Sequence, residues 1–323
     1  MSEIIRAKNV TKSFVKTKFN WRTFELEKEE KIAVNSLDLS IESGEFVGFL
    51  GPNGAGKTTF LKILSGIVYP TSGTVEVMGY IPWERDYKLL RHIAIVMGQK
   101  NQLWWDLPAI DSYKMLKEVY SISDKDFKKN LDRMAEILQM HDLLKKRLRD
   151  MSLGERMKCE LVACFLHDPK VIFLDEPTIG LDVVSSQAIR SFLKDINKTK
   201  KCTMILTSHY MGDIESLCDR VVIINHGAKI YDGKLASLKA KFSDEKRIEI
   251  FLPNLEDRQK FAHLKIDNKS ITDGKGLIYA DRKNLGEIVN AVYSHFEAGD
   301  ISITDPDTEE VITKVFQGQN INL

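Results

Sequence analysis

The sequence predicts an α/β fold in which helices flank a sheet of buried parallel strands. Three observations predict it. An apolar run at 45–50 leads into a glycine-rich loop, after which apolar residues recur at helical spacing. Two further apolar runs, 171–176 and 203–208, each end in polar side chains. Buried parallel strands show this pattern where their carboxyl ends deliver polar groups to a site.

The glycine-rich loop fills every fixed position of the pattern G-x-x-x-x-G-K-[ST]. Glycines allow consecutive backbone N–H groups to surround phosphate oxygens at a helix N-terminus, where the helix dipole favours an anion. Lys57 is expected to reach the β- and γ-phosphates of a nucleotide, and Thr58 to offer its hydroxyl to Mg²⁺. The expected nucleotide contacts are Gly51, Pro52, Asn53, Gly54, Ala55, Gly56, Lys57, Thr58 and Thr59. The loop places the predicted fold in the P-loop NTPase class.

Length and composition limit the remaining possibilities. The chain has 323 residues, more than a usual single domain, so two domains are expected. Its 47 basic residues nearly balance 46 acidic ones, which argues against nucleic acid as a partner. No apolar run is as long as a membrane span and no signal region follows Met1, so we expect a soluble, cytoplasmic protein. The cysteines lack metal-ligand spacing and are expected to be reduced core thiols: Cys159, Cys164, Cys202 and Cys218.

The segments around the loop predict two additions to the parallel sheet. Strands are expected at 4–14 and 33–41, in an antiparallel β subdomain. Between them, 15–31 begins basic and aromatic and ends acidic. Two interpretations stay open for it, an elongated hairpin between the two strands or an arm that contacts a partner or a membrane surface. Helical apolar spacing then predominates, which predicts a helical subdomain at about 89–160.

The second and third apolar runs end in residues suited to phosphoryl transfer. Asp175 and Glu176 end the second run. Asp175 is expected in the Mg²⁺ shell, and Glu176 is expected to orient and polarise the water that attacks the γ-phosphate. The third run ends on His209, which would converge on the same edge of the sheet.

Just before the acidic strand, Ser152-Leu153-Gly154-Glu155 leads into a helix expected at 157–166. The chain resembles the nucleotide-binding subunit of an ATP-binding-cassette (ABC) transporter over residues 1 to about 240. The resemblance rests on these elements in this order: the phosphate-binding loop, Gln99, the Ser152 motif, Asp175-Glu176, Gly180-Leu181-Asp182 and His209. It implies ATP and Mg²⁺ as cofactors, and ATP hydrolysis that energises a separate membrane permease from the inner face of the membrane.

The resemblance also implies a head-to-tail dimer of two copies. Ser152, Gly154 and Glu155 would meet the γ-phosphate of the ATP bound to the other copy, again at a helix N-terminus. Asp182 would lie in the loop that crosses the dimer. The motif departs from the commonest form, Ser-Gly-Gly-Gln, because Leu153 adds a side chain and Glu155 adds a charge. The phosphate contact is expected to survive because Ser152 and Gly154 are kept.

Further roles follow from the same resemblance. Gln99 would be the lid-loop glutamine that senses Mg²⁺ and the partner, although Gln102 is an alternative; Gln99 is preferred because it lies nearer the preceding strand. His209 would be the switch residue on the γ-phosphate. Adenine would stack on Phe14, with Val34 nearby.

The direction of transport and the partner surface come from the stretch 102–106. With the single cassette and the tail, this stretch resembles bacterial export-system ATPases. Its Trp104 and Trp105 are adjacent, so they cannot both face one core, and at least one indole should be exposed beside the groove where a permease helix docks. Two other functional classes were weighed: a soluble cassette ATPase acting on nucleic acid or ribosomes, and a phosphate-loop kinase.

Beyond about residue 240 the resemblance stops. Residues 241–323 are expected to form a C-terminal α+β accessory domain, with a ferredoxin-like arrangement as one option. Asn284 with Glu287, and Asp307 with Glu310, have the spacing of helix capping pairs. Strands are expected at 247–252, 276–280 and 300–304, and a helix at 284–296.

Overall fold

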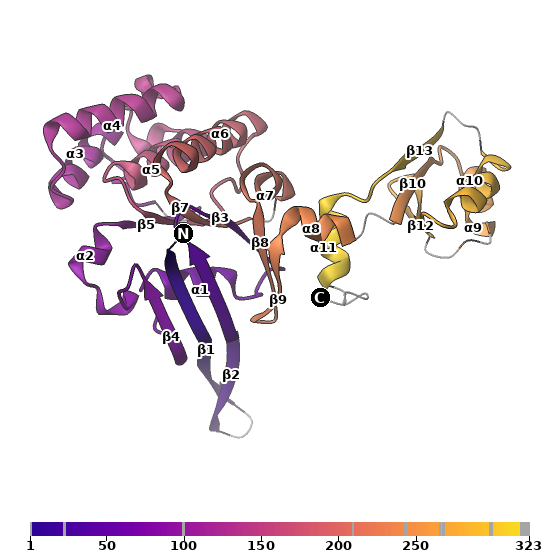
Figure 1. The fold of residues 1–323 in the computed structure, drawn as a ribbon, viewed down its shortest axis with the longest axis horizontal. Coiled ribbons are helices and arrows are strands. Elements are labelled where there is room, and N and C mark those ends of the chain that lie inside the picture. The colour runs from indigo at the N-terminus through magenta and orange to yellow at the C-terminus, as the bar shows by residue number, and fades with distance from the viewer. Residues whose placement is uncertain are drawn as a thin grey trace. The chain divides into compact units, whose positions relative to one another are not determined.

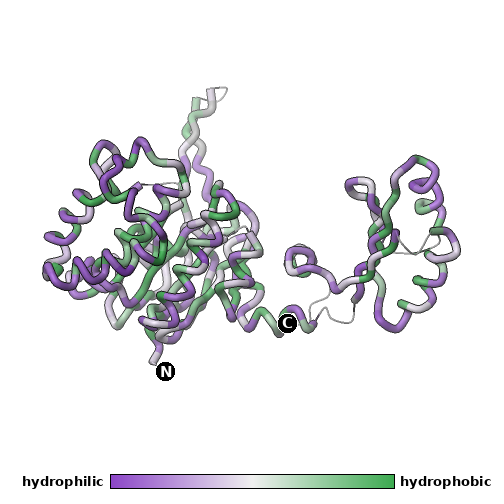
Figure 2. Tube along the Cα trace, turned by 90° about the horizontal axis from the view of Figure 1, so that it is seen from above, coloured by the Kyte–Doolittle hydropathy of each residue, from purple (hydrophilic) through white to green (hydrophobic). Residues whose placement is uncertain are grey.

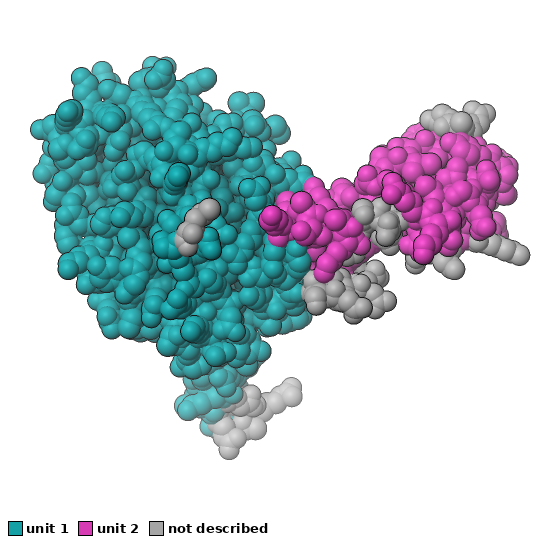
Figure 3. Space-filling view, viewed as in Figure 1, with its two compact units in different colours: residues 1–233 teal, residues 234–323 magenta. Residues whose placement is uncertain are grey.

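The computed structural model describes residues 2–21, 24–98, 101–208, 210–241, 245–264, 266, 269–296 and 300–316. The chain divides into two compact units, Met1–Gly233 (unit 1) and Lys234–Leu323 (unit 2), which Figure 3 colours separately. The boundary predicted from the sequence lies near residue 240. The division in the structure comes before helix α8 (Leu235–Lys241), which therefore falls in unit 2.

Unit 1 is built around a six-stranded sheet with the order β5-β6-β7-β3-β8-β9 (Figure 1). The pairs β5–β6, β6–β7, β7–β3 and β3–β8 are parallel. Both β3 and β7 are buried along their whole length, as expected for apolar strands covered on two faces. The three predicted strands are confirmed, and their carboxyl ends lie on one edge of the sheet. The six strands of the sheet are β3 (Phe46–Leu50), β5 (Ile93–Met97), β6 (Val171–Asp175), β7 (Thr203–Thr207), β8 (Arg220–Asn225) and β9 (Ala228–Lys234).

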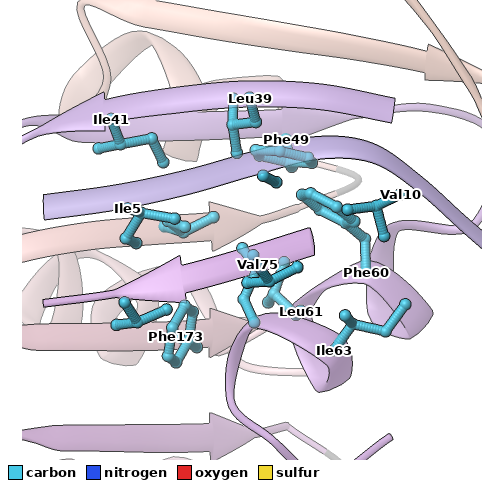
Figure 4. Packing of buried hydrophobic residues seen from close by; sticks show 14 of the residues in the cluster. Ile5, Val10, Leu39, Ile41, Phe49, Phe60, Leu61, Ile63, Val75 and Phe173 are labelled. Atoms are coloured by element: carbon cyan, nitrogen blue, oxygen red, sulfur yellow. The ribbon is translucent and has the colours of Figure 1, made fainter. Parts of the chain in front are cut away.

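A second sheet in unit 1 is antiparallel, with the order β2-β1-β4, and is formed by β1 (Glu3–Asn20), β2 (Glu25–Glu42) and β4 (Ser72–Val77). Its inward side chains, such as Ile5 and Val75, share a buried cluster with Phe49 of β3 and Phe60 of helix α1 (Lys57–Leu64), as Figure 4 shows. The rings of Phe49 and Phe60 stack 5.7 Å apart. The cluster therefore fixes β3 and α1, and with them the glycine-rich loop that joins the two.

Strands β1 and β2 continue beyond the sheet as a two-stranded ribbon that projects from unit 1 (Figure 1, Figure 2). Their pairing extends to Asn20 opposite Glu25, so the elongated hairpin predicted for 15–31 is confirmed. Near the end of the ribbon the rings of Phe19 and Trp21 meet edge to face at 4.8 Å, and both rings are exposed. The contact-arm interpretation remains open, because this apolar surface is not covered by the described part of unit 1.

The helical part of unit 1 contains α2 (Tyr87–Leu90), α3 (Ala109–Val119), α4 (Asp124–Ile137) and α5 (Leu153–Phe165). Strand β5 is the predicted strand that precedes Gln99, and it is confirmed at 93–97. It interrupts the range of the predicted helical subdomain because it pairs with β6 in the parallel sheet. The helix expected at 157–166 begins earlier, at Leu153, because Ser152 and Glu155 form a capping box that starts it. Helices α6 (Val183–Lys200) and α7 (Met211–Leu217) follow the loops after β6 and β7. Among the described residues, no helix is long and apolar enough to span a bilayer.

The four cysteines lie in unit 1, and all are buried and free, as predicted. Burial raises the pKa of Cys159, Cys164 and Cys202 to about 12. Such thiols stay protonated and behave as small apolar side chains.

Unit 2 contains a four-stranded antiparallel sheet with the order β11-β12-β10-β13 and its own buried cluster. The chain order β-α-β-β-α-β with this strand order is that of a ferredoxin-like module. The elements are β10 (Glu245–Phe251), α9 (Leu255–His263), β11 (Lys269–Thr272), β12 (Lys275–Asp281), α10 (Leu285–Tyr293) and β13 (Ile301–Thr304), followed by α11 (Thr308–Phe316). Helix α9 and strand β11 were not predicted.

The two capping pairs predicted in unit 2 have different outcomes. Asp307 and Glu310 bond reciprocally, with Asp307 Oδ1 accepting from the Glu310 N–H at 2.8 Å, so this pair is confirmed. Helix α10 begins directly after Asn284, so the predicted helix start is confirmed, but the Asn284 side chain makes no capping bond. The reason is local, because Asn284 itself has helical backbone angles (φ −101°, ψ 0°) rather than the extended conformation from which a side chain can cap.

Candidate functional site

The glycine-rich loop adopts a conformation that only glycine permits at two positions. A Cβ on Gly51 would lie 2.4 Å from the carbonyl oxygen of Ile224, and a Cβ on Gly56 would lie 2.1 Å from that of Ala33. Gly56 also has a φ of 104°, in the left-handed region. The loop is closed against the neighbouring backbone by the Gly227 N–H, which donates to the Ala55 carbonyl at 3.0 Å. The fixed glycines of the pattern are thus required by backbone packing.

Lys57 begins α1 and is buried inside the loop. Its Nζ donates to the carbonyl oxygens of Gly51 at 2.5 Å and of Pro52 at 3.1 Å. Burial lowers the pKa of Lys57, while the negative charges of Glu176 and Asp175 oppose that effect. An ammonium group held this way lies where the loop N–H groups converge, so it can meet a phosphate without moving far.

Asp175 connects three elements at the edge of the sheet. Its Oδ1 accepts from Thr58 Oγ1 at 2.9 Å and from Thr207 Oγ1 at 2.7 Å. The parallel register explains this meeting, because Asp175 of β6 lies opposite Thr207 of β7. Among the described residues no three His, Cys, Asp or Glu side chains form a metal cluster. Asp175 and Thr58 still suit Mg²⁺, which commonly takes one or two protein oxygens and completes its shell with water and substrate phosphates.

Glu176 follows directly on the same edge, with a φ of 54° in the left-handed region. This conformation costs a non-glycine residue about 1–2 kcal/mol. It is held by the Glu176 N–H, which donates to the Thr207 carbonyl at 3.0 Å. A Cβ on Gly98 would lie 2.2 Å from the Glu176 carbonyl oxygen, so the chain just before position 99 packs against this turn. The backbone strain is therefore located at the residue expected to act on water.

The Ser152 motif forms the N-terminus of α5. Ser152 Oγ accepts from the Glu155 N–H at 3.2 Å, and Glu155 Oε2 accepts from the Ser152 N–H at 2.7 Å. Glu155 also pairs with Lys146 at 2.9 Å. Burial raises the pKa of Glu155, but the bonds to Lys146 and Ser152 outweigh burial and lower it overall. The Glu155 carboxylate is therefore engaged in the cap and the ion pair of its own chain.

The Asp182 loop meets this helix N-terminus. A Cβ on Gly154 would lie 2.4 Å from Ser185 Oγ, which requires glycine at the contact. Asp182 caps α6 by accepting from the Ser185 N–H at 2.8 Å and from Ser185 Oγ at 2.7 Å, and these bonds lower its pKa. Ser152, Gly154 and Asp182 thus belong to one local surface.

Comparison with known proteins identifies the family. The sequence matches the family described as ABC transporter over residues 34–179. It is 32% identical to the ABC transporter ATP-binding protein NatA of Bacillus subtilis, over 72% of this chain and 95% of that protein. The chain belongs to the ABC transporter ATP-binding family. It is 31% identical to the Nod factor export ATP-binding protein I of Cupriavidus metallidurans, over 64% of this chain and 67% of that protein.

The fold of the cassette agrees with solved structures. A dimeric ATP-binding cassette in a post-hydrolysis state, bound to ADP and Pi, aligns with a TM-score of 0.61 and 23% identity, over 71% of this chain and 98% of that one. Family membership makes the chain an ATP-binding ATPase subunit, as the motifs predicted. Its own residues supply a glycine-rich loop with a buried cation, the hydrogen-bonded side-chain oxygens of Asp175 and Thr58, and the adjacent Glu176 carboxylate.

The structure describes some of the residues predicted for adenine stacking, the lid loop and the γ-phosphate switch. Phe14 is exposed on the ribbon, with Lys12 Nζ 5.0 Å from its ring centroid. Val34 is buried in the core cluster, so its side chain is not at the surface. Gln99 and His209 lie outside the described residues. The Gln102 side-chain amide donates to the carbonyl of Ile95 in β5 at 2.6 Å, which holds the amide against the sheet and makes Gln102 the weaker candidate for the lid.

Sequence reasoning missed two buried carboxylates. Glu160 of α5 is buried and accepts the backbone N–H groups of Gln102 and Leu103 at 3.0 Å and 3.2 Å, which anchors the tryptophan stretch. Burial raises the pKa of Glu160, and those two bonds oppose the rise. Asp213 of α7 is the second. No signal in the sequence marks either one as buried, because α5 and α7 each carry a second acidic residue.

Proposed function

We propose that two copies of the cassette form a head-to-tail dimer with ATP between them and drive export through a separate permease. The observation that carries the dimer is an exposed apolar surface around the Ser152 motif. Val183 and Val184 are 83% and 79% exposed beside Asp182, and Leu153 is exposed beside Ser152. Apolar side chains around a helix N-terminus with anion-binding capacity fit burial against the nucleotide-loaded face of a second copy.

Within each site, binding and water activation are assigned to different residues. Lys57 and the loop N–H groups bind the phosphates, and Thr58 with Asp175 holds Mg²⁺. The ion, when bound, neutralises charge on the phosphate oxygens. Glu176 orients the attacking water and accepts its proton. By resemblance, Gln99 and His209 contact the lid and the γ-phosphate, and Phe14 stacks on adenine.

The test of this assignment separates binding from turnover. Glu176→Gln keeps the shape of the side chain and removes its basicity, so ATP binding should persist while turnover falls roughly a hundredfold or more. Dimers should then accumulate with ATP on size-exclusion chromatography. Lys57→Ala should abolish both binding and dimer formation, because it removes the buried cation. Normal turnover by Glu176→Gln would show that the water is activated elsewhere.

The permease is proposed to dock in a groove between the sheet and the helical subdomain. A cavity of about 370 Å³ lies there, with a mainly apolar lining that includes Ile67, Leu90, Leu116, Val119 and Tyr120. The adjacent Trp104 and Trp105 are 43% and 44% exposed, which confirms that at least one indole lies at the surface. Arg156 lies 4.9 Å from the Trp105 ring centroid and Glu160 anchors the backbone before Trp104, so the indoles are presented on a fixed loop.

Docking can be tested with a candidate permease, namely any multi-spanning membrane protein that a neighbouring gene encodes. Replacing both Trp104 and Trp105 with alanine should preserve ATP binding and weaken co-purification with that protein, because a tryptophan at an interface contributes roughly 2 kcal/mol or more. The wild-type chain is the control, and Trp21→Ala shows separately whether the exposed indole on the ribbon contributes. Equal co-purification of the folded double variant and the control would leave the two tryptophans as local packing. Export as the direction is supported by the similarity to the Nod factor export protein of Cupriavidus metallidurans.

A further inference from the structure

Asp213 is a fully buried carboxylate in the first turn of α7, with 0% of its surface exposed. Its Oδ2 accepts from Ser208 Oγ at 2.7 Å and also from Thr178 Oγ1. Its Oδ1 accepts from Arg190 Nε at 2.7 Å. Three donors from three separate segments therefore converge on one charged group, whose burial is tolerated because it is paired and hydrogen-bonded.

The three segments surround the hydrolytic edge of the sheet. Thr178 comes two residues after Glu176, at the end of β6. Ser208 follows β7, and its Oγ also accepts from the Tyr210 N–H at 3.0 Å. The Arg190 guanidinium lies 5.1 Å from the Tyr210 ring centroid. Asp213 thus ties the chain after Glu176 to both described neighbours of position 209.

Packing contacts alone do not hold the segments around Asp213 in place, so hydrogen bonds must restrain them. A cavity of about 330 Å³ is lined by Glu176, Thr178, Arg190, Ser208 and Tyr210, among others. Side chains that border a cavity lack packing partners on that side, so dispersion contacts cannot fix them there. On the strand side, Thr207 already holds Asp175 and the Glu176 N–H. The Asp213 bonds complete the restraint on the side that faces the cavity.

We propose that Asp213 is a positioning residue for ATP hydrolysis, which holds Ser208 and Tyr210 at a fixed distance from Glu176. It touches no nucleotide in this scheme and acts through Thr178, Ser208 and Arg190. The inference rests on the proposed function, in which Glu176 activates water and position 209 meets the γ-phosphate. A buried carboxylate that accepts several hydrogen bonds suits this task, because polar groups lower the activation barrier of hydrolysis most when they are already in position.

The sharpest test uses Thr178, because Thr178→Val keeps the shape of the side chain and removes only its hydroxyl. In the full-length chain, Thr178→Val should lower kcat about tenfold or more and leave the Kd for ATP within about twofold. Thr178→Ser should rescue kcat because it restores the donor to Asp213. Thr199→Val is the matched control, since Thr199 Oγ1 accepts from Arg133 and donates to the Asp195 carbonyl near the C-terminal end of α6. That control should leave kcat unchanged.

A double-mutant cycle then asks whether the effect acts through Glu176. The effects of Asp213→Asn and Glu176→Gln on kcat should be non-additive, because Asp213 has little left to position once the base is lost. The inference is overturned if Thr178→Val and Thr199→Val have equal kcat, if Thr178→Ser fails to rescue, or if the cycle is additive. Normal turnover by Glu176→Gln alone would instead refute the proposed function, so the two failures are distinguishable.

Discussion

Replacing Ser152 with alanine should separate the capping role of this residue from its role toward ATP. The change removes the oxygen that accepts the Glu155 N–H at 3.2 Å and leaves the reciprocal bond from the Ser152 N–H to Glu155 in place. Loss of an N-cap side chain costs about 1 kcal/mol. In a unit the size of Met1–Gly233, that loss lowers the unfolding midpoint by about 2–4 °C.

The chain offers a closely matched control in Ser123, the N-cap of α4. Ser123 Oγ accepts from the Asp126 N–H at 3.1 Å, nearly the distance found at Ser152. Ser123→Ala should therefore lose about the same stability, again about 1 kcal/mol. Ser123 lies outside the candidate site, so this variant reports the effect of weakening a cap alone.

Function should distinguish the two variants. A hydrogen bond to a charged phosphate contributes about 1.5–3 kcal/mol, which corresponds to roughly ten- to a hundredfold in an equilibrium constant. Each dimer loses two such bonds with Ser152→Ala, one at each ATP. ATP-dependent dimerisation, measured by analytical ultracentrifugation in a Glu176→Gln background, should therefore weaken by about the square of that factor with Ser152→Ala and stay unchanged with Ser123→Ala. Equal dimerisation of the two variants would refute the contact between Ser152 and the ATP of the other copy.

Two further predictions concern pH and the C-terminal unit. Burial lowers the pKa of His167 to about 4 from its ordinary 6.5, so as pH falls from 6.5 to 4 the unfolded chain takes up a proton that the folded chain refuses. Stability should fall through this window by on the order of 3 kcal/mol, and unfolding midpoints of His167→Gln should depend less on pH; parallel slopes would contradict this. A chain ending near residue 240 should fold and bind ATP, because unit 2 has a buried cluster of its own. An insoluble truncated chain, with a single unfolding transition in the full chain, would contradict that separation.

The sequence could predict the sheet edge and its phosphate site because the signals are local. An apolar run followed by Gly51 and Lys57 specifies strand, loop and helix within one short stretch. Asp175 and Glu176 follow a run whose burial on both faces can be read from its composition. The long ribbon could also be predicted from the sequence, since its two strands are adjacent in the chain and their pairing requires only a turn.

Helix boundaries and the hydrogen-bond partners of side chains were harder to predict from the sequence. Ser152 and Glu155 have the spacing of a capping box, but their place in a family motif drew attention to phosphate contact, and the helix was expected to start later. Asn284 and Glu287 have the same spacing and make no such cap, because spacing does not determine the backbone angles at the first residue. Capping pairs are therefore decided by local conformation as well as by residue type.

The burial of two carboxylates could not be predicted from the local sequence. Glu160 and Asp213 each lie in a helix whose neighbours include other acidic residues, and nothing in the sequence separates a buried carboxylate from an exposed one. Burying a charge is costly unless donors converge on it, and the donors here come from distant segments, Gln102 and Leu103 for one and Thr178, Ser208 and Arg190 for the other. A carboxylate that persists in such a place holds those segments together. Glu160 holds the tryptophan loop and Asp213 holds the hydrolytic edge, so each is placed at a part of the cassette where a loop must keep one position.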